Sequence, residues 1–153
     1  MPAQEKNATT AEPCAVCGRY RTPSPTVDAV IYHPERGVVL VRRKNPPFGW
    51  ALPGGFVDYA ESVEHAAVRE AWEETGLDVT LAGLLGVYSD PARDSRMHTI
   101  STVFVAFAKD PDTIAGGDDA IEAAYFAVNA LPGEIVFDHR KMLDDFMASG
   151  FYP

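Results

Sequence analysis

Three glutamates, Glu70, Glu73 and Glu74, are spaced so that their side chains leave the same face of a helix. At about 100° per residue they fall within an arc of roughly 100°. Carboxylates at this spacing repel one another, so a helix carrying them gains from a cation above them, and Mg²⁺ or Mn²⁺ takes oxygen ligands of this kind. A solvated face of an amphipathic helix explains the same spacing equally well. The helix alone therefore leaves both interpretations open.

The residues around the glutamates define the ends and the opposite face of this helix. Ser62 is a suitable N-cap, the helical pattern runs over residues 63–75, and Gly76 ends it. On the side away from the glutamates, Val68 and Trp72 form an apolar stripe. We expect this stripe to pack in the core.

The flanking residues favour the cation site. Arg69 stands four residues before Glu73 and can orient its carboxylate. Gly54 and Gly55 allow a tight turn and a close backbone approach, which would bring a loop over the glutamates.

The segment from Gly55 to Leu77 resembles the box motif of the Nudix hydrolases at every fixed position. After Gly55 come five residues, Glu61, seven residues and the run Arg69-Glu70-Ala71-Trp72-Glu73-Glu74-Thr75-Gly76-Leu77. The lead-in at residues 50–55 is also typical of the family. The resemblance implies an α/β/α sandwich with a mixed β-sheet, in which a loop-helix-loop box binds Mg²⁺ (or Mn²⁺) and water attacks phosphorus in a pyrophosphate linkage.

The resemblance also implies roles for individual residues. The implied metal ligands are Glu70, Glu73, Glu74 and the backbone carbonyl of Gly55, with Arg69 orienting a glutamate and Glu61 structural. The family often takes its general base from a loop outside the box. Our candidate is Glu122, with Asp118 and Asp119 as weaker competitors, and an ordinary exposed acid remains the alternative for Glu122.

The loop over residues 88–98 resembles that of ADP-ribose pyrophosphatases, because Pro91 lies 15 residues beyond Gly76. This predicts hydrolysis of ADP-ribose, a small nucleotide, to AMP and ribose 5-phosphate. Basic side chains that could bind its phosphates or ribose hydroxyls are Arg42, Arg93, Arg96 and His98. His139 resembles a recurrent element before the last helix, but we expect no site role for it.

Two rival functions stay open beside this one. A house-cleaning nucleoside triphosphate pyrophosphohydrolase would cut a triphosphate to a monophosphate. A non-catalytic sensor of ADP-ribose is the remoter alternative, because such proteins usually lose box glutamates and gain a DNA-binding domain, whereas this sequence keeps the glutamates.

The length of 153 residues suits one domain. Residues 1–25 are expected to be an extension and residues 26–153 the catalytic domain. Runs at 26–32, 37–43, 77–88, 99–108 and 123–128 are predicted strands, and residues 138–148 a last helix. The net charge of −9 argues against long nucleic acid as a ligand. No apolar run of membrane-spanning length occurs, so we expect a cytoplasmic protein.

The only cysteines, Cys14 and Cys17, lie in the extension, which excludes a disulfide framework. A structural zinc site wants four protein ligands, and the chain offers no second pair. We therefore expect no zinc there. Half of a site shared across a homodimer stays open as the alternative.

Overall fold

The computed structural model describes residues 13, 15–117 and 119–153. In this part of the chain seven strands form a mixed sheet around β1 (Ser24–His33), which pairs antiparallel with β2 (Gly37–Arg43) and β4 (Gly54–Phe56) and parallel with β6 (Thr99–Ala108). The outer strands are β5 (Val79–Tyr88) beside β6, and β3 (Trp50–Ala51) and β7 (Ala120–Phe126) beside β2.

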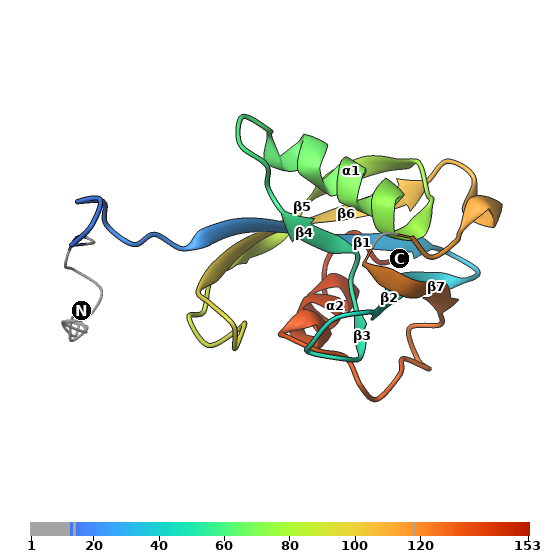
Figure 1. Cartoon of the computed structure of the whole chain (residues 1–153). Helices are drawn as coiled ribbons and strands as arrows, with labels where there is room; N and C mark the ends of the chain where they lie inside the picture. The colour runs from blue at the N-terminus through green and yellow to red at the C-terminus, as the bar shows by residue number, and fades with distance from the viewer. Residues whose placement is uncertain (1–12, 14, 118) are drawn as a thin grey trace.

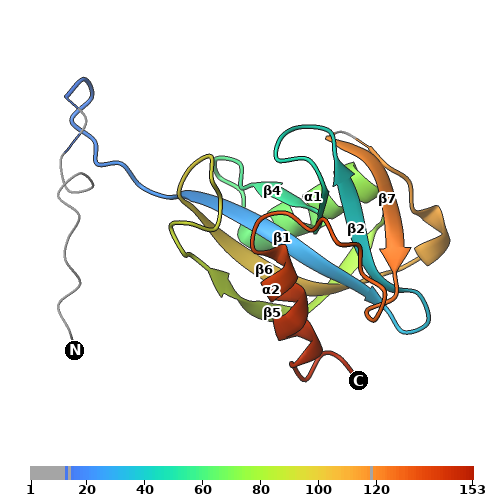
Figure 2. The same cartoon turned by 90° about the horizontal axis from the view of Figure 1, so that it is seen from below.

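The helices α1 (Val63–Thr75) and α2 (His139–Met147) cover opposite sides of this sheet, as Figures 1 and 2 show. Successive residues of β1 serve the two sides in turn, because side chains alternate along a strand. Ala29 and Ile31 pack in the cluster beneath α1, whereas Val30 and Tyr32 pack with the apolar residues of α2. The predicted α/β/α sandwich with a mixed sheet is confirmed.

Helix α1 has the bounds that the sequence predicts. The Ser62 hydroxyl oxygen accepts a hydrogen bond from the His65 amide at 3.2 Å, and Gly76 ends the helix with a left-handed φ of 69°. The Gly76 amide donates to the Trp72 carbonyl. Both caps are local signals, so the sequence alone places this helix correctly.

The predicted packing of Trp72 is wrong, because 62% of this residue is exposed. The face of α1 that meets the sheet consists of small residues, Ala66, Ala67 and Ala71, all at most 1% exposed. At about 100° per residue Glu74 falls within this face and Trp72 falls nearly opposite it. Small side chains let the helix approach the sheet closely, and Glu74 is buried with them.

Other boundaries differ modestly from the expected ones. Strand β1 begins at Ser24 rather than Thr26, and β7 begins at Ala120 rather than Ala123, so Glu122 lies within a strand. A short 3₁₀ turn, Pro111–Thr113, interrupts the acidic loop. The division into extension and domain at residue 25 stays a prediction.

The described part of the extension projects away from the sheet before β1, as Figure 1 shows. Cys17 there is exposed, and Cys14 lies outside the described residues. The predictions for zinc and for a homodimer therefore remain untested. Neither described helix is long and apolar enough to cross a membrane.

Candidate active-site cleft

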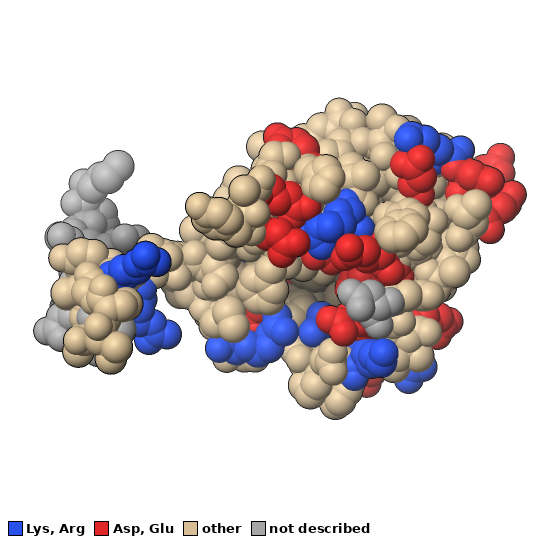
Figure 3. Space-filling view, turned by 45° about the horizontal axis from the view of Figure 1, so that its top comes forward, with Lys and Arg blue, Asp and Glu red and all other residues tan. Residues whose placement is uncertain are grey.

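A cleft of about 290 Å³ opens where β1, β2 and β4 meet α1, the loop after β5 and the start of α2. Figure 3 shows acidic and basic side chains gathered around a hollow on this side of the molecule. Its charged lining residues are Asp28, Arg43, Asp58, Arg69, Glu70, Glu73, Glu74, Arg93, Asp94, Arg96 and Asp119. More carboxylates than guanidinium groups therefore border it.

Arg69 ties the carboxylates of α1 to the preceding loop. Its Nη1 donates to Glu70 Oε1 at 2.8 Å and to Glu73 Oε2 at 3.0 Å. Its Nε and Nη2 donate to the two oxygens of Glu61, at 2.9 and 2.8 Å. The hydrogen bonds that Arg69 donates hold the pKa of Glu61 well below its usual range, and the same bonds, to Glu61 and Glu70, raise the pKa of Arg69. Glu61 thus anchors the guanidinium that spans two box glutamates.

Glu74 faces the sheet and is only 7% exposed. Its Oε2 accepts a hydrogen bond from the Gly54 amide at 3.0 Å. Burial raises the pKa of Glu74 to about 8, and the negative charges of Glu70 and Asp28 add to the effect. Burial likewise raises the pKa of Asp28 to about 7. Ionising these buried carboxyl groups costs free energy because they are removed from water and lie near other negative charges. A bound cation would offset that cost.

The two glycines of β4 allow this close packing. Gly55 pairs with Val27 of β1, and a methyl group on Gly55 would overlap the Glu70 carboxylate. A methyl group on Gly54 would overlap the backbone of Val27 and the side chain of Asp28. The overlap at Gly54 is with backbone, so only glycine lets β4 pair this closely with β1, whereas at Gly55 the Glu70 carboxylate would have to move.

The donor set suits a hard divalent cation, since carboxylate and carbonyl oxygens lie around one cleft. Within residues 13, 15–117 and 119–153, no three carboxylate, imidazole or thiol groups already converge on a common point. Glu70 and Glu73 bond to Arg69 and Glu74 bonds to Gly54, so their oxygens would have to turn inward around a metal.

Phe137 and His139, at the start of α2, border the cleft, and Asp138 lies between them in the sequence. Asp138 accepts hydrogen bonds from Arg93 Nε and Nη2 at 3.1 and 2.8 Å. His139 Nδ1 accepts from the Leu52 amide at 2.9 Å, and its Nε2 lies 3.4 Å from Asp28 Oδ1. Burial lowers the pKa of His139 to about 3, so the ring is neutral. With Nδ1 accepting, the ring proton sits on Nε2 and faces Asp28.

The structure brings most of the candidate residues together. Those that border the cleft are Gly55, Arg69, Glu70, Glu73, Glu74, Arg93, Arg96 and also His139, which we expected to lie outside the site. Arg93 is buried in its ion pair with Asp138, which gives it a structural function. Asp119 borders the cleft too, and Asp118 lies outside the described residues.

Four candidates lie elsewhere, namely Arg42, Pro91, His98 and Glu122. Arg42 and Glu122 are exposed cross-strand neighbours in the antiparallel pair of β2 and β7. Pro91 and His98 are exposed in the loop between β5 and β6. None of the four is among the residues that border the cleft.

Sequence reasoning missed Asp28 and Phe137, and it chose Arg42 over the neighbouring Arg43, although Arg43 is the one that borders the cleft. Arg43 follows Arg42 in β2, and alternation along a strand allows only one of the two to face the cleft. The sequence gives no sign of which one does, because both are arginines at the end of the same strand.

Comparisons with known proteins agree with this geometry. The sequence model of the NUDIX domain matches residues 22–146. The chain is 48% identical over 134 residues to the ADP-ribose pyrophosphatase of Methanocaldococcus jannaschii, covering 84% of this chain and 75% of that protein. It is 32% identical over 117 residues to a Bacillus subtilis protein named "Putative 8-oxo-dGTP diphosphatase", covering 76% of this chain and 75% of that one.

A solved structure shares the fold. It is a bifunctional NMN adenylyltransferase/ADP ribose pyrophosphatase from Francisella tularensis, complexed with AMP and Mn ion. The TM-score is 0.71 at 28% identity, covering 84% of this chain. This chain spans only 42% of the Francisella chain.

The close approach at Gly55 predicts the effect of a single methyl group. Gly55→Ala should lower kcat/KM by at least about tenfold, because the methyl group displaces the Glu70 carboxylate. Gly133→Ala is the matched control, since a methyl group there meets nothing within 4 Å. Steady-state rates and melting temperatures of both variants would check this. Full activity in Gly55→Ala would show that β4 does not constrain Glu70.

Proposed function

The chain belongs to the Nudix family of pyrophosphohydrolases, and from that premise we propose that it hydrolyses ADP-ribose to AMP and ribose 5-phosphate with Mg²⁺. The observation that carries the proposal is the 48% identity to an ADP-ribose pyrophosphatase over most of both chains. The box residues that border the cleft, Gly55, Arg69, Glu70, Glu73 and Glu74, support it.

We propose Glu70, Glu73, Glu74 and the Gly55 carbonyl as the metal ligands. Bound there, Mg²⁺ would neutralise the diphosphate and lower the pKa of a bound water. The Francisella relative complexed with AMP and Mn ion supports a divalent metal. Arg69 keeps Glu70 and Glu73 together on one side of the cleft, so that their repulsion is balanced before metal binds.

The general base is better sought at Asp119 than at Glu122. Asp119 borders the cleft, and its Oδ1 accepts a hydrogen bond from Asn45 Nδ2 at 3.2 Å. Glu122 is exposed beside Arg42 on the sheet. In the proposed reaction the base takes a proton from water as water attacks phosphorus, and the bridging P–O bond breaks.

A nucleoside triphosphate pyrophosphohydrolase is the second candidate. The 32% identity to the Bacillus protein favours it, since that protein is named for 8-oxo-dGTP. Both substrates bring a charged phosphate chain to the same carboxylates. The two proposals therefore differ in the leaving group and share the metal chemistry.

The metal assignment predicts that Glu73→Gln loses turnover and metal response together. kcat should fall by at least about 10²-fold, because a charged ligand is replaced by a neutral one. Mn²⁺ should raise the melting temperature of the wild type and raise that of the variant much less. Glu64→Gln is the control, since Glu64 lies exposed in the first turn of the same helix. Wild-type rates in Glu73→Gln would contradict the assignment.

The substrate proposal predicts that the protein prefers ADP-ribose in a panel of nucleotide substrates. ADP-ribose should have a higher kcat/KM than dGTP or 8-oxo-dGTP, and should yield AMP and ribose 5-phosphate. A tenfold preference corresponds to about 1.4 kcal/mol in transition-state binding. Product analysis and initial rates on the purified protein measure both. A tenfold advantage for the triphosphates would replace the proposal with the second candidate.

A further inference from the structure

Phe137 occupies an unusual backbone conformation at the edge of the cleft. Its φ is 59°, in the left-handed region that bulky residues rarely adopt. Its neighbours hold it there, because Asp138 is bound to Arg93 and His139 to the Leu52 amide. A backbone conformation that costs free energy persists only where the surrounding structure fixes it, and such residues cluster at functional sites.

Two guanidinium groups lie over the ring of Phe137. The Cζ atom of Arg43 is 5.0 Å from the ring centroid, and that of Arg96 is 5.2 Å away. They come from different elements, β2 and the loop between β5 and β6. The negative face of an aromatic ring attracts cations, so one ring draws together two groups that would otherwise repel.

Of the two arginines, Arg43 is the one whose positive charge is available to a bound anion. Its Nε donates to the Pro47 carbonyl at 2.9 Å, and no ion pair joins it to a carboxylate of the described residues. Arg96 by contrast is paired with Asp94, through Nη2 at 2.9 Å. Burial, and then the charge of Arg96, lower the pKa of Arg43. A half-buried guanidinium beside a like charge is stabilised by an anion.

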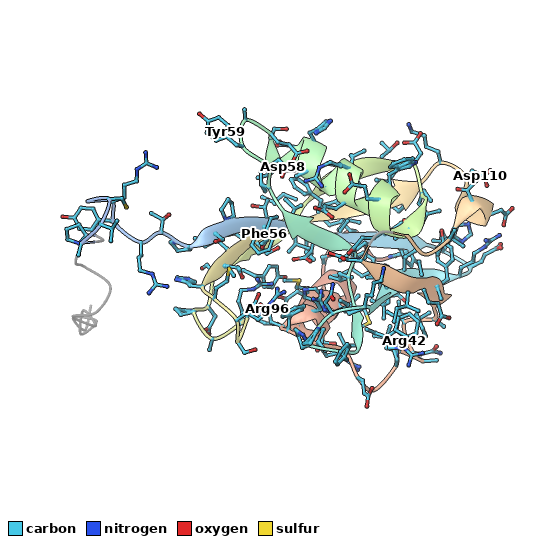
Figure 4. All side chains as sticks on the ribbon, viewed as in Figure 1. Arg42, Phe56, Asp58, Tyr59, Arg96 and Asp110 are labelled. Carbon is cyan, nitrogen blue, oxygen red and sulfur yellow. The ribbon has the colours of Figure 1, made fainter. Side chains whose placement is uncertain are left out.

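Arg43 and Arg96 line the same cleft as the carboxylates of α1. In Figure 4 the labelled residues Asp58, Phe56 and Arg96, which all border this cleft, lie in that order from the α1 side toward α2. An elongated diphosphate in this cleft would meet glutamates on one side and guanidinium groups on the other.

We propose that Phe137 is a positioning residue that holds Arg43 and Arg96 together as a binding site for the diphosphate of the substrate. This rests on the proposed function only in requiring a substrate with a diphosphate. The ring contributes through its face, and Leu in its place would fill similar space without attracting the cations.

Substitutions at Phe137 separate this role from simple packing. Phe137→Leu should raise KM about three- to tenfold with little change in kcat, and Phe137→Tyr, which keeps the ring face, should restore the wild-type KM. Phe107→Leu makes the same change on an exposed part of β6 and should leave KM unchanged. Each variant is assayed with the nucleotide that the wild type hydrolyses fastest.

A double-mutant cycle with Arg43→Gln, which removes the positive charge over the ring, tests the connection. If Phe137 acts through Arg43, Phe137→Leu should raise KM far less in the Arg43→Gln background than in the wild type. Effects that simply multiply would overturn the proposal, as would an unchanged KM in Phe137→Leu.

If Phe137→Leu does not fold, Arg43→Gln alone decides, because it removes the guanidinium and leaves the left-handed backbone at Phe137 untouched. An unchanged KM in that variant would overturn the proposal. A preference for triphosphates over ADP-ribose would refute the proposed substrate and leave the cycle interpretable, since it uses whichever substrate is hydrolysed.

Discussion

The repulsion among carboxylates gathered at one cleft is the constraint on which the rest of the structure depends. Glu70, Glu73 and Glu74 leave neighbouring positions of α1, and Asp28 faces them from β1. Arg69 balances two of the charges, and the Gly54 amide supports a third. The remaining excess of negative charge makes the cleft suited to a divalent cation and, through it, to phosphate.

Fold and site are connected through small residues. Alanines on the inner face of α1 let the helix approach the sheet, and Gly55 lets β4 lie against Glu70. Glu74 lies on this inner face with the alanines and is only 7% exposed. On the other side of the sheet, Asp138 binds Arg93 in the loop between β5 and β6, and His139 binds the Leu52 amide just before the box. These two contacts fix the start of α2. Each wall of the cleft is thus held by a different element.

The sequence predicts what local patterns determine. The caps of α1, the box glutamates and the mixed α/β sandwich follow from spacing and from the family motif. What depends on strand register could not be predicted. Arg42 and Arg43 are neighbours in sequence, and only the pairing of β2 with β7 puts Arg42 beside Glu122 on the exposed surface. The prediction for Trp72 was wrong because the sheet side of α1 consists of small residues, Ala66, Ala67 and Ala71, and the indole lies on the opposite, exposed side.

Binding of the catalytic metal by the glutamates of α1 is tested most directly by diffraction from crystals soaked in Mn²⁺, with data collected at the manganese absorption edge. We expect an anomalous peak bordered by Glu70, Glu73 and Glu74, with their carboxylates turned from Arg69 and Gly54 toward the ion. A strong peak elsewhere in the molecule, with none at these three side chains, would contradict it.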